Sequence, residues 1–224
     1  MIPVAVVALL VANTDASMQN AEEMAVPARQ ANEPSQPSQP ATPDAVHEEP
    51  HRVEGPNYVV PIVHDLALLA VMRAAETVIW PNPFARPEQF GARYEEAFTH
   101  PPVFEPRRRF MEWDGDPWPV NTIGHGLFGS ELYLRARMCR FPWYGSVAFA
   151  AGASALWEYG FEANGSRPSA LDLVYTPLAG ALLGEARFAI HRVAGGIESK
   201  TTRGIVRAIV DPLGEMERAL GTDC

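Results

Sequence analysis

The sequence has no excess of positive charge. Its 18 lysine and arginine residues stand against 27 aspartate and glutamate residues, which gives a net charge of −9. Binding to a nucleic-acid backbone needs clustered lysine and arginine, so we expect no nucleic-acid partner. Much of the negative charge lies in residues 1–56, where eight acidic residues accompany only two arginines.

Cysteine is scarce. Cys139 and Cys224 are too few for a disulfide framework, and nothing around them has C-x-x-C metal-ligand spacing. Two interpretations are open. The two cysteines pair in an oxidising compartment, or Cys139 is a buried thiol and Cys224 a free thiol near the C-terminus. We expect the second.

The motifs of several enzyme classes are absent. The chain contains no G-x-S-x-G elbow, no H-E-x-x-H pair and no glycine-rich phosphate loop between a strand and a helix. The sequence therefore identifies no reaction. We predict no cofactor and leave a divalent metal open as an alternative.

No apolar run is long enough to cross a membrane, which takes roughly 20 residues. The chain opens MIPVAVVALLVANTDASMQ, with an apolar run over residues 2–12 followed by small residues. This pattern is typical of a signal peptide, here residues 1–17, although no lysine or arginine precedes the run. A retained N-terminal anchor is the alternative.

Residues 18–56 are rich in proline, glutamate, serine and glutamine and have almost no aromatic residues. Such a segment buries too little surface to offset its chain entropy, so we predict a disordered acidic linker. Residues 57–224 then form the folded domain.

Helical patterns dominate this domain and strand patterns are weak. We predict a mainly α fold, a helical bundle of about four to five helices that includes short apolar ones. The expected helices are 63–80, 122–138, 143–163, 169–194 and 200–220. The prolines of residues 81–121 predict a long irregular connection.

Local signals set several boundaries. Ser169 and Asp172 form an S-x-x-D capping box at the start of 169–194, and Pro212 should break 200–220. The same final segment places four apolar residues on one face: Ile205, Ile209, Leu213 and Met216.

Two uncharged stretches favour contact with a membrane. Residues 141–157 and 173–184 contain no charged residue, but both are shorter than a spanning helix. Trp143, Tyr144 and Trp157 at the ends of the first stretch resemble interfacial anchors. The alternative is the core of a soluble helical domain.

Three predicted helices carry small or polar residues four positions apart, a spacing that puts them on one helix face. Gly129, Gly180 and Gly184 within these rows predict close helix packing. The titratable members are His125, Glu158, Glu162 and Asp172. If these four face inward, they form a buried cluster.

Two interpretations of this cluster are open. As a chemical site, the four residues are candidates for acid–base catalysis or for metal ligation. As a structural network, they hold the helices together, with Arg135 and Arg167 as counter-charges. The structural polar cluster would contain Asn121, His125, Tyr133, Ser154, Trp157, Glu158, Glu162, Arg167, Asp172 and Glu185.

The strings NTIGHGLFGSELYLRAR and SALWEYGFEANGSRPSALDLVYTPLAGALLGE resemble a bacterial family of envelope proteins, domain of unknown function 3943, over about residues 114–190. The matching residues are Asn121, His125, Gly129, Tyr133, Arg137, Ser154, Trp157, Glu158, Glu162, Pro168, Ser169, Asp172, Gly180, Gly184 and Glu185. Gly126 departs from the proline expected after the histidine. The pattern E-x-x-x-E, R-P-S-x-x-D-L and G-x-x-x-G is also similar to the VanZ-like group of small membrane proteins.

The resemblance implies an envelope location but no reaction. Our first hypothesis is an exported, membrane-associated helical bundle in the periplasm, with a structural or interaction role and a lipid or envelope protein as partner. The second is a hydrolase-type enzyme that acts on a lipid or envelope glycan through Glu158 or Glu162 with His125. The third is a soluble periplasmic adaptor.

Overall fold

The computed structural model describes residues 55–224. The predicted signal peptide (1–17) and nearly all of the predicted linker (18–56) lie outside the described residues. Residues 55–224 are mainly α-helical, as predicted, and their one β-type contact is an isolated bridge between Val103 and Ser169.

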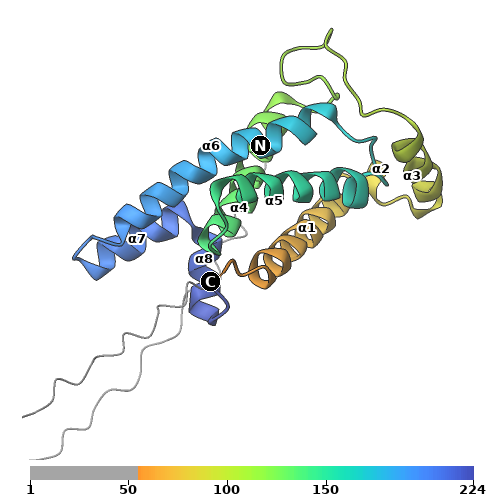
Figure 1. Ribbon diagram of the computed structural model, residues 1–224. Coiled ribbons are helices and arrows are strands. Elements are labelled where there is room, and N and C mark those ends of the chain that lie inside the picture. The colour runs from red at the N-terminus through yellow and green to blue at the C-terminus, as the bar shows by residue number, and fades with distance from the viewer. Residues whose placement is uncertain (1–54) are drawn as a thin grey trace, which may run out of the picture. The chain divides into compact units, whose positions relative to one another are not determined.

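The helical elements follow one another with short connections, apart from the segment between Thr99 and Val120 (Figure 1). Here η1 is a 3-10 turn, and η2 and η3 are π-helical turns. In chain order they are α1 (Val59–Ile79), α2 (Pro81–Phe84), η1 (Pro87–Gln89), α3 (Phe90–Thr99), η2 (Val120–Gly124), α4 (His125–Met138), α5 (Trp143–Leu156), η3 (Trp157–Glu162), α6 (Ala170–Ala194), α7 (Lys200–Val210) and α8 (Pro212–Leu220).

Helices α4 and α6 pack with their backbones in close contact. A Cβ atom added at Gly129 would overlap the carbonyl of Thr176, and one added at Gly180 would overlap the backbone of Gly129. At Gly184 an added Cβ would lie 2.7 Å from Cδ1 of Tyr133. These three glycines are the positions where the two helices come closest, and α5 packs against both helices.

Two helices that we expected to be regular contain π-helical turns. The segment expected as 143–163 changes from α5 into η3 at Trp157, and the segment expected as 122–138 begins with η2 before α4 starts at His125. A π-helical turn adds a residue to the helical repeat and is frequent at functional sites. Here the two turns carry or adjoin Glu158, Glu162 and His125.

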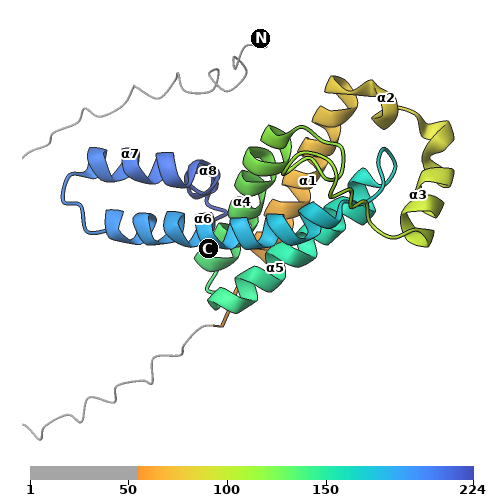
Figure 2. The same ribbon diagram turned by 90° about the horizontal axis from the view of Figure 1, so that it is seen from above.

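The start of α6 matches its sequence signal. Ser169 Oγ accepts a hydrogen bond from the backbone N–H of Asp172 at 3.1 Å. This bond satisfies one of the free amides of the first turn. The chain turns after Ala194, and α7 returns beside α6 as the second arm of a hairpin (Figure 2).

The final segment breaks where proline predicts, but its apolar face is not buried. Pro212 lacks an N–H, so α7 ends at Val210 and α8 begins after Asp211, whose Oδ1 accepts from the N–H of Gly214 at 3.0 Å. The chain bends there. Ile205, Ile209 and Met216, three of the four apolar residues expected on one face, are 56%, 74% and 61% exposed, and Leu213 is half-buried.

The expectation of two free thiols is wrong. Cys139 and Cys224 form a disulfide, with their Cα atoms 5.0 Å apart. Helix α8 brings the C-terminus back to the end of α4, and this return is what places Cys224 beside Cys139. The bond closes a loop of 85 residues.

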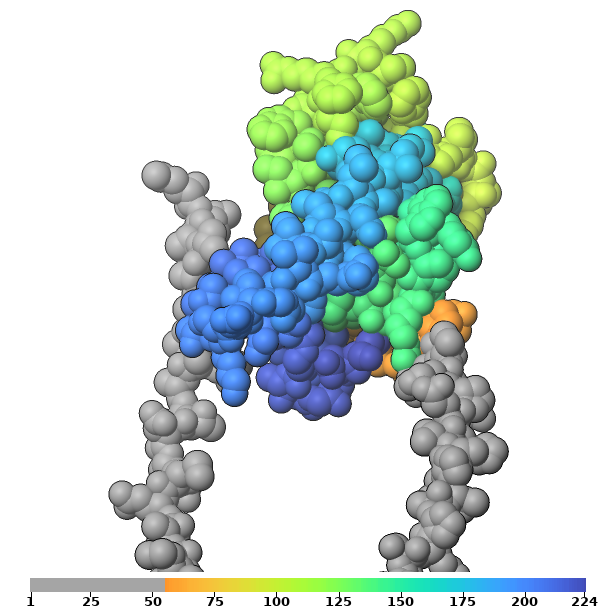
Figure 3. Space-filling view, turned by 60° about the vertical axis from the view of Figure 1, so that its left-hand side comes forward, coloured from red at the N-terminus to blue at the C-terminus, as the bar shows by residue number. Residues whose placement is uncertain are grey.

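Large apolar side chains remain on the surface of several helices. On α6, Val174, Leu178 and Leu182 form an exposed row four residues apart. Helix α6 crosses the face drawn in Figure 3 with α5 beside it. Within residues 55–224, no helix has both the length and the hydropathy needed to cross a membrane.

Candidate functional site

His125 is the first residue of α4 and lies at the N-terminal end of the interface with α6. Its side chain is buried, and its Nδ1 lies 3.0 Å from Thr176 Oγ1 and 3.6 Å from Asp172 Oδ1. Burial lowers the pKa of His125 to about 4, although the charge of Asp114 acts in the opposite direction. The imidazole is therefore neutral at pH 7, the form that binds metals and accepts protons.

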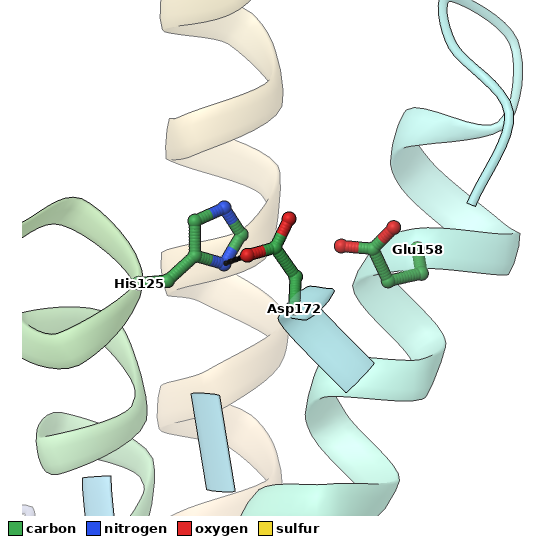
Figure 4. A group of neighbouring side chains, drawn as sticks. All are labelled: His125, Glu158 and Asp172. Atoms are coloured by element: carbon green, nitrogen blue, oxygen red, sulfur yellow. Dashed lines mark ion pairs between the residues drawn. The ribbon is translucent and has the colours of Figure 1, made fainter. Parts of the chain in front are cut away.

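Glu158 and Asp172 face His125 from η3 and from the first turn of α6 (Figure 4). Each is only 2% exposed. Glu158 Oε2 accepts a hydrogen bond from the N–H of Ser169 at 2.7 Å. Glu158 Oε1 and Asp172 Oδ1 have no hydrogen-bond partner among residues 55–224. One ligand atom from each of His125, Glu158 and Asp172 lies within 4.8 Å of the others.

Ionisation of these two buried carboxyl groups costs free energy, and their pKa values are raised. Burial and the neighbouring Glu162 raise the pKa of Glu158, and burial and the charge of Asp114 raise the pKa of Asp172 to about 9. Burial disfavours an ionised carboxylate, and a second carboxylate disfavours it further. At neutral pH without a bound cation, Asp172 therefore keeps its proton.

Asp114 forms a second layer around Asp172. Its carboxylate accepts hydrogen bonds from Ser169 Oγ and from Asn121 Nδ2, both at 2.7 Å. Burial acts to raise the pKa of Asp114, but these bonds and a hydrogen bond from Asp172 together lower it. Asp114 is thus the ionised partner and Asp172 the protonated one. Environments that separate the pKa values of two carboxyl groups in this way are typical of acid–base sites.

A cavity of about 390 Å³ opens beside this group. Its walls are mostly apolar, and His125, Glu76, Asp116 and Glu162 contribute its titratable groups. Burial and the charge of Asp116 raise the pKa of Glu162 to about 7, and burial and the charge of Glu162 raise that of Glu76 to about 8. The apolar lining residues include Met72, Trp80, Phe84, Phe128 and Trp157.

The structure brings together most of the residues that the sequence singled out. His125, Glu158 and Asp172 meet directly, Asn121 joins them through Asp114, and Ser154 Oγ donates to the backbone carbonyl of Asp172 at 3.3 Å. Trp157 and Glu162 line the adjoining cavity.

Four residues predicted for the cluster or as its counter-charges lie elsewhere: Tyr133, Glu185, Arg167 and Arg135. Tyr133 and Arg137 bind the carboxylate of Glu185 on the far part of the α4–α6 interface, at 2.6 Å and 2.9 Å. Arg167, expected as a counter-charge of the cluster, pairs with Glu96 at 3.7 Å. Arg135 belongs to a separate ion network. Neither arginine forms an ion pair with Glu158 or Asp172 in the described part of the chain.

That separate network was not predicted. Arg135 pairs with Glu131 at 3.2 Å, with Asp211 at 3.1 Å and with Glu217 at 3.0 Å. His64 Nδ1 lies 2.5 Å from Glu217 Oε1. The network joins α1, α4 and α8, and its arginine is 2% exposed.

Sequence reasoning also missed Asp114 and Glu76. Asp114 lies in the irregular segment EWDGDPWPV, 55 residues before Ser169, and Glu76 lies on α1. For Asp114 the available signal was the length of the 81–121 connection, because long connections often carry function.

Two of the comparisons with known proteins found nothing: no curated protein and no solved structure matches the chain. A family model matches residues 110–213, which include Asp114, Asn121, His125, Glu158 and Asp172 but not Glu76. The match thus covers the polar group and the α4–α6 interface and leaves out α1 and α3. The family to which residues 110–213 are similar is described as Domain of unknown function (DUF3943).

Proposed function

We propose that the protein is an exported, membrane-associated protein of the bacterial envelope that performs hydrolase-type chemistry on a lipid or envelope glycan. The observation that carries this proposal is the cavity of about 390 Å³, whose lining is mostly apolar and includes four titratable side chains. Apolar walls suit an acyl or prenyl chain. The carboxyl groups suit proton transfer at its polar end.

Within the cavity, Glu162 is the general base of the proposed reaction. It lines the cavity, and Ser166 Oγ donates to its Oε1 at 3.0 Å, which holds the carboxylate in place. His125 also lines the cavity and is neutral, so it can donate or accept a hydrogen bond with the substrate. Glu158 and Asp172 lie behind His125 and set its surroundings.

The envelope location has independent support. The Cys139–Cys224 disulfide is of the kind that persists in oxidising compartments such as the periplasm. The apolar run of residues 2–12 is typical of a signal peptide. The exposed row of Val174, Leu178 and Leu182 offers apolar surface to a lipid layer.

Lipid turnover tests the chemistry. The purified full-length protein is incubated with vesicles made from a bacterial envelope lipid extract, and the products are identified by mass spectrometry. Glu162→Gln should reduce turnover by about 100-fold or more, the usual contribution of a general base. Glu185→Gln, which removes a carboxylate outside the cavity, should leave turnover unchanged. If neither the lipids nor added envelope glycans are altered by the wild type, the proposed chemistry is wrong.

Vesicle flotation tests the membrane association separately. The full-length protein should float with vesicles of the same extract, and Leu178→Glu with Leu182→Glu should reduce the bound fraction. Both side chains are more than half exposed, so these changes leave the core packing intact. Equal flotation of wild type and variant would remove the α6 row from the proposal.

A structural role is the second candidate, favoured by one observation. The bond from the Ser169 N–H to Glu158 joins the start of η3 to the start of α6. In this case the polar group holds the bundle together and carries out no reaction. Glu158→Gln distinguishes the two candidates, because a structural Glu158 predicts loss of folding on substitution and a functional one predicts a folded protein.

A further inference from the structure

We propose that His125, Glu158 and Asp172 bind one divalent transition-metal ion. This inference deepens the proposed function, on which it rests for the use of the ion, because His125 faces both this site and the cavity. Binding of the ion itself needs no substrate and can be measured alone.

The spacing of the three side chains suits a single ion. A zinc-type ion lies about 2.0–2.2 Å from each nitrogen or oxygen ligand, so neighbouring ligand atoms end up about 3.4 Å apart. Nδ1 of His125 and Oδ1 of Asp172 are already 3.6 Å apart. All three ligand atoms lie within 4.8 Å. An approach of about 1.4 Å or less between the more distant ligand atoms would close the site to this ligand spacing.

The free oxygen atoms point to a cation. Glu158 Oε1 and Asp172 Oδ1 are buried and have no hydrogen-bond partner in the described part of the chain, and each of the two residues is 2% exposed. Figure 4 shows Asp172 between His125 and Glu158, with the Glu158 carboxylate directed at it. A buried carboxylate oxygen without a partner is costly. One cation would satisfy both oxygens, whereas Arg135 and Arg167 pair with other carboxylates.

The surrounding residues orient the ligands as outer-shell groups do in metal sites. The Ser169 N–H holds Oε2 of Glu158 at 2.7 Å and leaves Oε1 free. Asn121 holds Asp114 beside Asp172, and when Asp172 loses its proton to become a ligand, the hydrogen bond between the two carboxyl groups needs that proton to lie on Asp114. Partners of this kind fix the direction of a ligand and raise metal affinity.

The donor set identifies the class of ion. One imidazole nitrogen with two carboxylate oxygens suits zinc, manganese or ferrous iron, whereas calcium and magnesium favour oxygen ligands alone. Three protein ligands leave a coordination position open, which is characteristic of a catalytic site and not of a closed structural one. The cavity adjoins the proposed ion site at His125, which belongs to both.

Titration calorimetry on the chelator-treated full-length protein tests the proposal, with ZnCl₂ and MnCl₂ as probes. The wild type should bind one ion per chain. Asp172→Asn and Glu158→Gln should each weaken binding about tenfold or more, since each removes a ligand. Glu185→Gln is the matched control, because it removes a carboxylate that binds Tyr133 and Arg137 instead, and it should bind as the wild type does.

A variant that binds no ion could have lost its fold. Thermal unfolding without metal checks whether each variant is folded. Both substitutions keep the size of the side chain and replace a buried carboxyl group that is costly to hold without a cation, so the metal-free variants should melt at or above the wild-type temperature. The same concentration of ZnCl₂ should raise the melting temperature of the wild type more than that of either variant. Equal zinc affinity in the wild type and in the Glu158→Gln, Asp172→Asn double variant would overturn the proposal.

The two proposals fail in different ways. Ion binding without turnover of any lipid or glycan would overturn the proposed chemistry and leave the metal site standing. Turnover by a chelator-treated protein that binds no ion in the calorimeter would overturn the metal site and leave the chemistry standing.

Discussion

Gly129 of α4 and Gly180 of α6 lie in direct backbone contact, and neither position has space for a methyl group. This contact lies one helical turn along α4 from His125 and two turns along α6 from Asp172. The separation of the two helices therefore determines how close His125 comes to Asp172.

Gly180→Ala should destabilise the protein by about 1–3 kcal/mol, because the added Cβ would overlap the backbone of Gly129 and force the helices apart. The free energy of unfolding in urea measures the effect. Gly152→Ala is the matched control. Gly152 lies inside α5 with no atom within 4 Å of an added Cβ, so alanine should stabilise the helix by about 0.5–1 kcal/mol. Equal effects at both positions would show that the α4–α6 contact is not tight.

Reduction of the Cys139–Cys224 disulfide should lower the free energy of unfolding by about 3–4 kcal/mol. The bond closes a loop of 85 residues and limits the freedom of the unfolded chain. Urea unfolding with and without dithiothreitol measures the change. The Cys139→Ser, Cys224→Ser double variant should unfold like the reduced protein and show no response to dithiothreitol. If the urea unfolding curve of the wild type is the same with and without dithiothreitol, the prediction is wrong.

Structural features that depend on residues close together in the chain could be predicted from the sequence. The Ser169 cap, the break at Pro212 and the helical spacing of α4, α5 and α6 each depend on neighbouring residues, and they set the fold class. The three glycines of the α4–α6 contact also follow from spacing along single helices.

Contacts between segments far apart in the chain could not be predicted from the sequence. Asp114 reaches Ser169 across 55 residues, and no local pattern encodes that pairing. The exposure of Ile205 and Ile209 depends on the direction that the chain takes after Asp211, which helical spacing does not report. Arg135 was assigned to the wrong cluster for an avoidable reason: ten residues of helix separate it from His125 by about 15 Å.

Arg135→Met should destabilise the protein by about 3–5 kcal/mol. The arginine is buried and pairs with Glu131, Asp211 and Glu217, and its removal leaves buried carboxylates without their cation. Urea unfolding at pH 7 measures the loss. Arg86→Met removes a surface arginine and should change stability by about 0.5 kcal/mol or less. If the two variants are equally stable, the ion network does not hold α8 to α4.

Asp65 should make the protein less stable as the pH rises. Burial and the charges of Glu131 and Glu217 raise its pKa from 3.8 to about 8, although Arg135 acts to lower it. Between these two values the folded state binds more protons than the unfolded state, so stability from this group is present at low pH and is lost toward pH 8.

Asp65→Asn removes that dependence. Relative to the wild type, the variant should gain about 1.4 kcal/mol of stability for each pH unit from pH 5 to pH 8, which amounts to about 4 kcal/mol. Urea unfolding at several pH values measures the difference. Glu95→Gln, at an exposed position on α3, should show a constant difference from the wild type over the same range. A flat difference for Asp65→Asn as well would mean that Asp65 ionises normally and finds a partner in the folded protein.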